Sequence, residues 1–200
     1  CFMCGEGLQT QGETTQVREE GMGAAIFGYS KLYGSVPGGQ AELLRVPQAQ
    51  NTAIKVPDGP ADDRFLYLSD VLPTAWQAVS YADVPKGGTV VVLGLGPIGD
   101  MSARVATHHG ARVIGVDLVP ERLARAAERG IEVLDWREHH GELGELIRDC
   151  PDGRGPDAVI DAVGMEAHGA PAAGLVQKAA SLLPDPIHEL LMRTGGVDRL

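Results

Sequence analysis

The chain has 200 residues, of which 44% are hydrophobic, and its 17 basic and 27 acidic side chains give a formal net charge of −10. This composition predicts a soluble globular protein with one large or two small domains. The acidic charge disfavours attraction to nucleic-acid phosphates or anionic membranes, and no apolar stretch is long enough to span a bilayer. We therefore expect a cytoplasmic protein that acts on a small molecule, with no nucleic-acid or membrane partner.

The first part of the chain has two sections with different patterns. Residues 1–24 are rich in Gly, Glu, Gln and Thr without periodicity, which predicts an irregular lobe that needs a staple such as a metal. Cys1 and Cys4 form a C-x-x-C pair, and with the distant Cys150 they are too few for a disulfide scaffold. From residue 26 to 57, short apolar pieces punctuated by Gly and Pro predict short strands, and hence a small β-rich domain.

Residues 63–82 have the spacing of a helix, with Ser69 or Asp70 placed to cap its N-terminus. This helix is expected to bridge two domains. We place the domain boundary near residue 84, which divides the chain into residues 1–84 and 85–200.

The run from Thr89 to Gly99 is an apolar strand that breaks into Gly-Leu-Gly-Pro-Ile-Gly. In a dinucleotide-binding turn, Gly94 permits the tight bend, Gly96 lets the backbone approach a pyrophosphate, and Gly99 lets the next helix pack against the strand. That helix begins near Pro97, so its free N–H groups and its positive dipole end would face the anion. The alternative is a tight turn that binds nothing. The predicted contacts of the turn are Gly94, Gly96, Pro97, Ile98 and Gly99.

Asp117 ends the next predicted strand, 21 residues after Gly96. A carboxylate at this place can accept both hydroxyl hydrogens of an adenosine ribose and would repel a 2′-phosphate, so it favours NAD over NADP. Arg122 is the nearby cation that could soften this preference. Its two interpretations, a cofactor contact and a solvated helix face, are equally good.

Strands and helices alternate as far as residue 163: helix 97–109 stopped by Gly110, strand 112–117, helix 120–129, strand 131–134, helix 138–149 and strand 157–163. Right-handed crossovers between such strands give a parallel sheet. Val163 would line the cofactor cleft because it lies at the carboxyl end of its strand, although a structural role fits it equally. A weaker pattern predicts one more helix near residues 174–183.

Three segments together resemble the zinc-containing medium-chain alcohol dehydrogenase superfamily, and within it the glutathione-independent formaldehyde dehydrogenases: residues 27–42, 68–76 and 94–99. The resemblance implies an α/β fold, in which an incomplete Rossmann-type doubly wound parallel sheet follows part of a β-rich GroES-like catalytic domain. It also implies NAD and zinc as cofactors, a small alcohol or hydrated formaldehyde as substrate, and a homo-oligomeric full-length protein. The strand order 3-2-1-4 would leave residues 157–163 at the edge.

The same resemblance implies that Asp70 is the third protein ligand of a catalytic zinc, whose open position would activate an alcohol for hydride transfer. Without the resemblance, the better interpretation of Asp70 is a helix N-cap. Thr74, one turn further along, is expected near the nicotinamide end of the cofactor. The family's other two zinc ligands, a Cys and a His, lie upstream of Cys1.

A second zinc site of the family uses four cysteines, and Cys1 and Cys4 match the second and third of them. Gly12 stands at the fourth position. Either a substitute such as Glu13 completes the site or the metal is lost or weakly bound, and we favour loss because a carboxylate would have to replace a softer thiolate.

Two alternatives to the dehydrogenase hypothesis remain open at this point. The chain by itself is expected to be inactive, so it would act as a truncated NAD-binding module. A zinc-free quinone reductase of the same superfamily would use NADPH without a metal, and Asp117 and Asp70 both argue against it.

Overall fold

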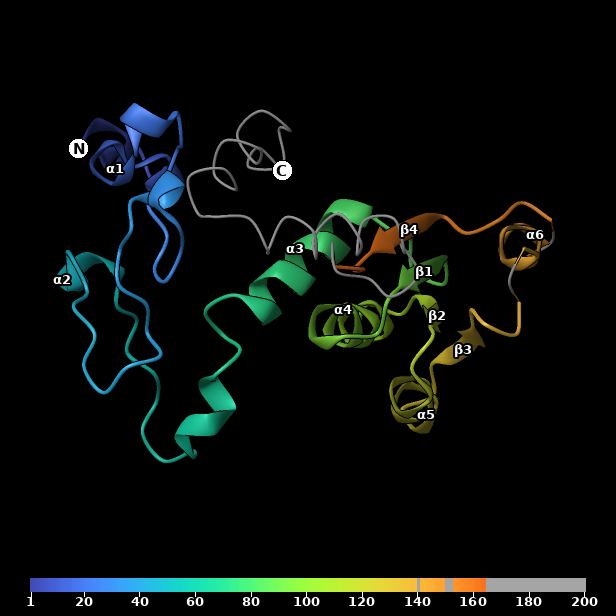
Figure 1. The fold of residues 1–200 in the computed structure, drawn as a ribbon. Helices are drawn as coiled ribbons and strands as arrows, with labels where there is room; N and C mark the ends of the chain where they lie inside the picture. The colour runs from blue at the N-terminus through green and yellow to red at the C-terminus, as the bar shows by residue number, and fades with distance from the viewer. Residues whose placement is uncertain (140, 150–152, 165–200) are drawn as a thin grey trace, which may run out of the picture. The chain divides into compact units, whose positions relative to one another are not determined.

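A computed structural model describes residues 1–139, 141–149 and 153–164 (Figure 1). The chain divides between Lys55 and Val56 into two compact units. The helix predicted to bridge two domains therefore belongs to the unit that contains the sheet, and the domain boundary near residue 84 stays a prediction. Cys150 and the helix expected at 174–183 lie outside the described residues. No helix in the described ranges is both long enough and apolar enough to cross a bilayer.

The first unit is built from short helical turns and loops. Its described residues form two isolated β-bridges, Val17 with Met22 and Phe27 with Val36, and no strand. The short strands expected between residues 26 and 57 are therefore wrong. The reason is local backbone geometry, since the positive φ angles of Gly28, Gly34, Ser35 and Gln48 turn the chain before an extended run can pair. The helical segments are α1 (Phe2–Gly5), α2 (Ala49–Thr52) and 3₁₀ turns at Gln9–Gln11, Glu13–Thr15, Arg18–Glu20 and Lys31–Tyr33.

The second unit contains a four-stranded parallel sheet with the order β3-β2-β1-β4. The predicted order 3-2-1-4 is confirmed. Since β4 pairs only with β1 in the described part of the chain, it forms one edge of this sheet. The strands are β1 (Thr89–Leu93), β2 (Arg112–Asp117), β3 (Glu132–Asp135) and β4 (Ala158–Asp161).

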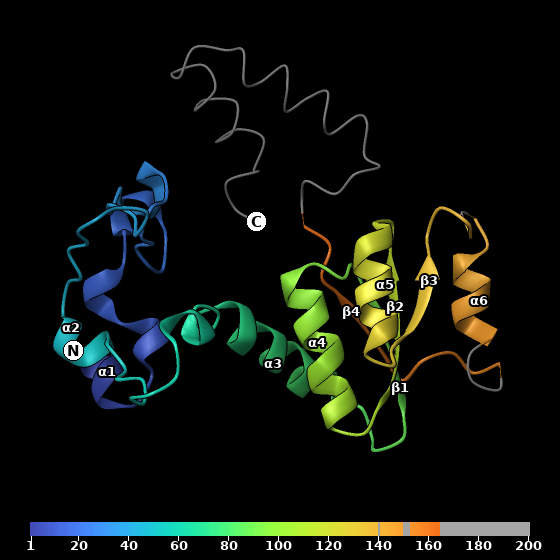
Figure 2. The same cartoon turned by 90° about the horizontal axis from the view of Figure 1, so that it is seen from below.

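Helices cover both faces of the sheet, with α4 and α5 on one face and α6 on the other (Figure 2). The predicted helices 97–109 and 120–129 are confirmed to within one residue, and Gly110 ends the first with a φ of 85°. The predicted helix 138–149 begins late, because Gly141 has a φ of 95° that no helix accommodates. The helices are α3 (Val71–Ala82), α4 (Pro97–His108), α5 (Pro120–Glu128) and α6 (Leu143–Asp149), preceded by a 3₁₀ turn at Asp62–Phe65.

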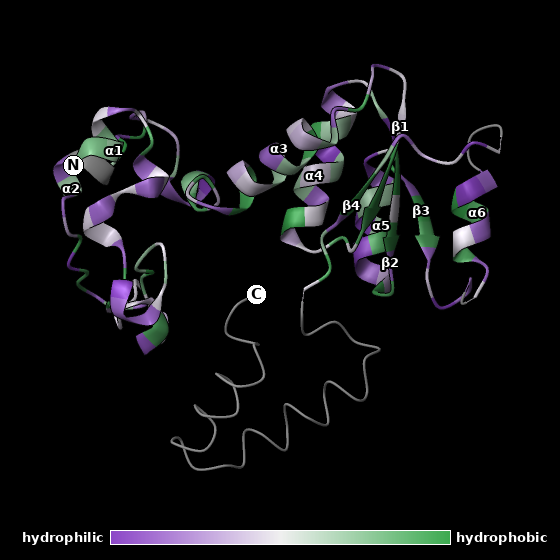
Figure 3. Ribbon diagram, turned by 90° about the horizontal axis from the view of Figure 1, so that it is seen from above, coloured by the Kyte–Doolittle hydropathy of each residue, from purple (hydrophilic) through white to green (hydrophobic). Residues whose placement is uncertain are grey.

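The two central strands, β1 and β2, are buried on both faces, which is why their sequences are largely apolar (Figure 3). Val90 and Val92 face the core under α3, α4 and α5, whereas Val91 faces the smaller core under α6 with Ile114 and Val116. Each buried valine of β1 contributes about 1.5–3 kcal/mol relative to an exposed one. This core fixes the carboxyl ends of the strands, where the candidate site lies.

The edge strand β4 is tied to β1 by a side chain. Asp157, just before β4, accepts a hydrogen bond from the backbone N–H of Thr89 over 2.8 Å, and Arg154 forms an ion pair with the same carboxylate. Thr89 is buried, so its N–H has no access to bulk water. The Asp157 carboxylate therefore supplies the acceptor that starts the β1–β4 ladder.

Candidate functional site

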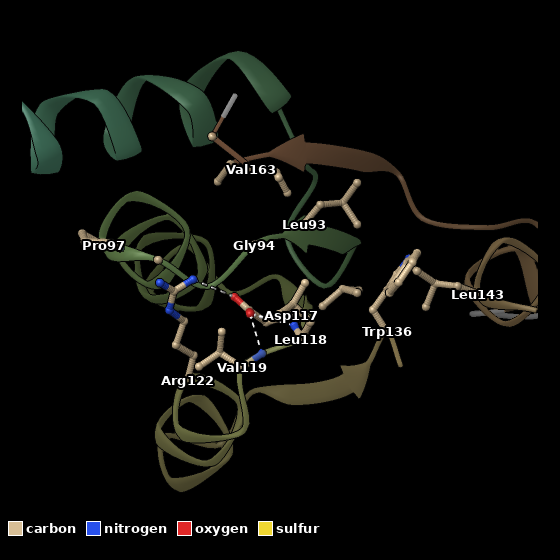
Figure 4. Close-up of a pocket in the computed structure, with 14 residues that line it drawn as sticks. Leu93, Gly94, Pro97, Asp117, Leu118, Val119, Arg122, Trp136, Leu143 and Val163 are labelled. Carbon is tan, nitrogen blue, oxygen red and sulfur yellow. Dashed lines mark hydrogen bonds and ion pairs between the residues drawn. The ribbon is translucent and has the colours of Figure 1, made fainter. Parts of the chain in front are cut away.

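A cleft of about 550 Å³ opens at the carboxyl ends of β1, β2 and β4 (Figure 4). This is the edge of the sheet at which doubly wound folds bind ligands, next to the point where the strand order reverses. Of the predicted cofactor residues, Gly94, Gly96, Pro97, Asp117, Arg122 and Val163 line it. Ile98 and Gly99 belong to the same turn without lining the cleft, and Thr74 does not line it either.

The three glycines of the turn have separable roles. Gly94 has a φ of 81° and donates its N–H to Val116 over 2.7 Å, so it bends the chain off β1 while staying bonded to β2. A Cβ on Gly99 would overlap the carbonyl oxygen of Gly94, so only glycine allows α4 to approach the strand this closely. A Cβ on Gly96 would meet only the Arg122 guanidinium, at 3.9 Å. Packing inside the protein therefore does not require glycine at position 96. The missing side chain instead leaves space in the cleft.

The N-terminus of α4 is open to a ligand. Pro97 occupies its first position, and Asp100 donates its N–H to Gly96 over 2.8 Å. The N–H groups of Ile98 and Gly99 find no acceptor in residues 1–139, 141–149 and 153–164. Free first-turn N–H groups and the positive end of the helix dipole together attract an anion.

Asp117 is almost completely buried, with 4% of its side chain exposed, and its carboxylate is already well bonded. One carboxylate oxygen accepts the N–H groups of Leu118 and Val119 over 2.7 and 2.9 Å, and the other accepts that of Leu95 over 2.6 Å. The sequence predicted the position of Asp117 but not these bonds. Only the oxygen bonded to Leu95 keeps a free lone pair for a ligand hydroxyl.

These contacts decide the charge of Asp117. Burial alone would raise the pKa of its carboxyl group, but the three backbone N–H donors and the nearby Arg122 outweigh burial and hold the pKa below its ordinary value. The carboxylate therefore stays ionised at neutral pH and can accept hydrogen bonds.

Arg122 turns from α5 toward Asp117, with 3.6 Å between the guanidinium and the carboxylate (Figure 4). Its side chain is 44% exposed and lines the cleft. The structure therefore places Arg122 in the wall of the cleft, and its contact with a cofactor stays a prediction.

Sequence reasoning missed part of the cleft wall. Trp136 and Leu143 line it on the side of β3 and α6, and the backbone N–H of Trp136 donates to the carbonyl oxygen of Asp117 over 3.0 Å. Trp136 directly follows β3, so the strand-end rule used for Val163 would have found it. Together with Leu118 these side chains make an apolar surface that suits a flat aromatic base.

Asp70 immediately precedes α3 but makes no side-chain bond to the helix backbone, so the N-cap bond expected of it is not formed. Its carboxylate instead accepts the hydroxyl hydrogen of Thr74 over 2.8 Å. In the described ranges, no three His, Cys, Asp or Glu side chains lie close enough together to hold a metal. The residues described here therefore do not by themselves make a zinc site at Asp70.

Cys1 and Cys4 are exposed free thiols whose sulfur atoms lie 3.3 Å apart. Gly12 lies next to them, and a Cβ built on it would be 3.6 Å from the sulfur of Cys4. Glu13 does not complete a group of three ligands with the pair in the described part of the chain. A side chain at position 12 would therefore lie beside the sulfur of Cys4, and the four-cysteine site implied by the resemblance stays a prediction.

Comparison with known proteins agrees with this geometry. Residues 97–183 match the family model of zinc-binding dehydrogenases. AdhB of Bacillus subtilis, an uncharacterized zinc-type alcohol dehydrogenase-like protein, is 39% identical over 170 residues, which cover 83% of this chain and 44% of that protein. The glutathione-independent formaldehyde dehydrogenase of Pseudomonas aeruginosa is 36% identical over 187 residues, or 90% of this chain and 45% of that protein. The chain spans less than half the length of these two relatives.

The solved structures that this chain resembles are also alcohol dehydrogenases. The alcohol dehydrogenase TADH from Thermus sp. superposes with a TM-score of 0.69 at 30% identity, over 89% of this chain and 47% of that one. The zinc dependent alcohol dehydrogenase 2 of Streptococcus superposes with a TM-score of 0.62, also at 30% identity, over 82% of this chain and 43% of that one. With its Rossmann-type sheet, its glycine turn and these relatives, the chain belongs to the zinc-type alcohol dehydrogenase superfamily.

Proposed function

We propose that this chain carries the NAD-binding site of a dehydrogenase that oxidises a small alcohol or hydrated aldehyde. The observation that carries the proposal is that one cleft joins a side-chain-free Gly96, the open N-terminus of α4 and the ionised carboxylate of Asp117. An anionic pyrophosphate, a ribose and an aromatic base each have a complementary surface there.

The geometry supports a separate role for each residue. The N–H groups at the start of α4 would hold the pyrophosphate, while Asp117 would accept a ribose hydroxyl on its less occupied oxygen. Arg122 would shift aside to contact the ribose or a phosphate. The adenine would lie against Trp136 and Leu143, and Val163 would border the nicotinamide half.

NAD, when bound, supplies the hydride acceptor for the oxidation. The described residues of this chain would bind and orient it, and they would exclude water from one side of the cleft. Zinc and the substrate belong to the whole protein in this proposal, with Asp70 as one ligand among others outside the described part and Thr74 close to it. A homo-oligomeric state of that protein remains a prediction.

For the chain itself we propose nucleotide binding without turnover. This second candidate rests on the finding that no three metal-ligating side chains gather in the described ranges. NADH formation followed at 340 nm with ethanol and with formaldehyde separates the two candidates, because turnover by the chain alone would rule out the binding-only form.

The cofactor assignment is tested by titrating NAD and NADP calorimetrically into the native chain and into Asp117→Ser. We expect the native chain to prefer NAD, and the variant to lose about tenfold in NAD affinity while the ratio of NADP to NAD affinity rises, since a charge-assisted bond to ribose and a repulsion of 2′-phosphate both disappear.

Asp135→Ser is the matched control, because Asp135 also ends a strand and also pairs with an arginine, Arg137, but does not line the cleft. Its NAD affinity should equal that of the native chain. If the native chain binds neither nucleotide, or if Asp117→Ser keeps the native ratio, the assignment is wrong.

A further inference from the structure

The peptide groups on either side of Leu95, in the middle of the glycine turn, are bonded from two directions. The N–H of Leu95 donates to Asp117 over 2.6 Å, and its carbonyl oxygen accepts a hydrogen bond from the Arg125 guanidinium over 3.3 Å. Leu95 itself is completely buried. The turn is therefore held between the end of β2 and the side of α5 before any ligand arrives.

The same guanidinium also reaches α4. Its Nε lies 3.7 Å from the carboxylate of Asp100, which in turn forms a hydrogen-bonded ion pair with Arg129. The side chain of Asp100 is only 12% exposed and belongs to the first turn of α4, where an anionic ligand is expected. Two arginines thus compensate a buried negative charge that would otherwise repel that ligand.

We propose that Arg125 is a positioning residue for the nucleotide phosphates. It does not line the cleft, so it acts through Leu95 and Asp100: it fixes the turn and screens the carboxylate behind it. This inference rests on the proposed nucleotide-binding function and adds a residue outside the cleft that controls affinity.

The chemistry explains why an arginine is needed. A guanidinium has several donors in a fixed plane, so it can bond a backbone carbonyl and face a carboxylate at the same time. A lysine ammonium at this place keeps the charge near Asp100 but reaches one of the two acceptors at a time. Arg125→Lys should therefore restore only part of the effect that Arg125→Gln removes.

The test compares Arg125→Gln and Arg125→Lys with the native chain in two measurements. The first is the hydrogen exchange rate of the Leu95 amide without ligand, followed by NMR, which we expect to rise about tenfold in Arg125→Gln. The second is affinity for ADP-ribose by calorimetry and for adenosine by NMR titration. ADP-ribose should bind about fivefold more weakly to Arg125→Gln, the worth of about one hydrogen bond, whereas adenosine binding should stay within twofold.

Arg104→Gln is the control for the loss of one charge, because Arg104 is exposed on α4 and has no side-chain bond or ion pair with the described residues. Equal losses for ADP-ribose and adenosine with a lowered melting temperature, or an unchanged Leu95 exchange rate, would overturn the positioning role. If the native chain fails to bind ADP-ribose, the proposed function is wrong, and the exchange rate still decides whether Arg125 holds the turn.

Discussion

At the scale of single residues, Gly96 and Gly99 can be told apart by what a methyl group would meet. We expect Gly96→Ala to keep the native stability but to weaken NAD binding at least tenfold, because the new Cβ would enter the space left for a phosphate. Gly99→Ala should instead lower the free energy of unfolding by several kcal/mol, since its Cβ overlaps the Gly94 carbonyl. Chemical denaturation and calorimetry measure the two effects, and equal destabilisation by both substitutions would contradict this division.

Asp117 should make stability depend on pH in a definite direction. Its pKa in the folded chain is lower than the ordinary value of 3.8, so ionisation stabilises the fold above about pH 4, and this contribution is lost as the pH falls through the folded pKa. We expect Asp117→Asn to reduce the free energy of unfolding by about 1–3 kcal/mol at pH 7. The difference in free energy of unfolding between the native chain and Asp117→Asn should shrink steadily below pH 4. If chemical denaturation gives the same difference at every pH between 3 and 7, the mechanism is excluded.

Which of these residue roles can be predicted from the sequence depends on how local the interaction is. The glycine spacing and Asp117 follow from one βαβ unit, so the places of Gly94, Gly96 and Asp117 in the cleft could be predicted. The bond between Arg125 and Leu95 joins residues 30 positions apart, and the pair of Arg129 with Asp100 joins residues 29 positions apart. Such pairs depend on the orientation of α5 about its own axis, and no rule of sequence spacing predicts that orientation.

At the scale of elements, the β1–β4 ladder depends on the Asp157 carboxylate. Asp157→Ala would leave the buried N–H of Thr89 without its acceptor, and we expect a loss of about 1–3 kcal/mol in the free energy of unfolding. Compared with the native chain, Asp157→Ala should show a larger increase in hydrogen exchange rate at the amides of β4 than at those of β2, which would locate the effect. Arg154→Gln is the control, because a side chain that is 74% exposed contributes less than about 1 kcal/mol through its ion pair.

The elements themselves were predicted well where their pattern is self-contained. The helices α4 and α5 begin with Pro and are followed by Gly at positive φ, and these two signals predicted where each helix begins and ends. The segment from residue 26 to 57 was predicted wrongly because positive φ angles at Gly28, Gly34, Ser35 and Gln48 turn the chain between its apolar pieces. The apolar pattern shows the pieces but does not show these backbone angles.

At the scale of the whole chain, metal content follows from which thiols and carboxylates come together. We expect less than one zinc per chain in elemental analysis, and no change in melting temperature when a chelator is added, because no group of three ligands forms in the described ranges. Two tightly held zinc ions per chain would show that the sites are complete.

A single substitution should restore part of the missing cluster. In Gly12→Cys, a third thiolate would approach the Cys1–Cys4 pair, since its Cβ would lie 3.6 Å from the sulfur of Cys4. We expect zinc affinity, measured by competition with a chromophoric chelator, to rise at least tenfold over the native chain. Gly12→Ser, which adds a similar volume without a soft ligand, should leave the affinity unchanged.

The hydrogen bonds that hold Leu95 on both sides have a consequence for the thermodynamics of nucleotide binding. Because the turn is already ordered in the empty protein, little conformational entropy remains to be lost when a nucleotide enters. The heat-capacity change on nucleotide binding should therefore reflect only the apolar surface that the nucleotide buries. No slow rearrangement of the turn should precede binding. If the proposed nucleotide binding holds, the cleft would recognise its ligand by a shape that the empty protein already has, and that shape would last as long as the β-sheet beneath it stays folded.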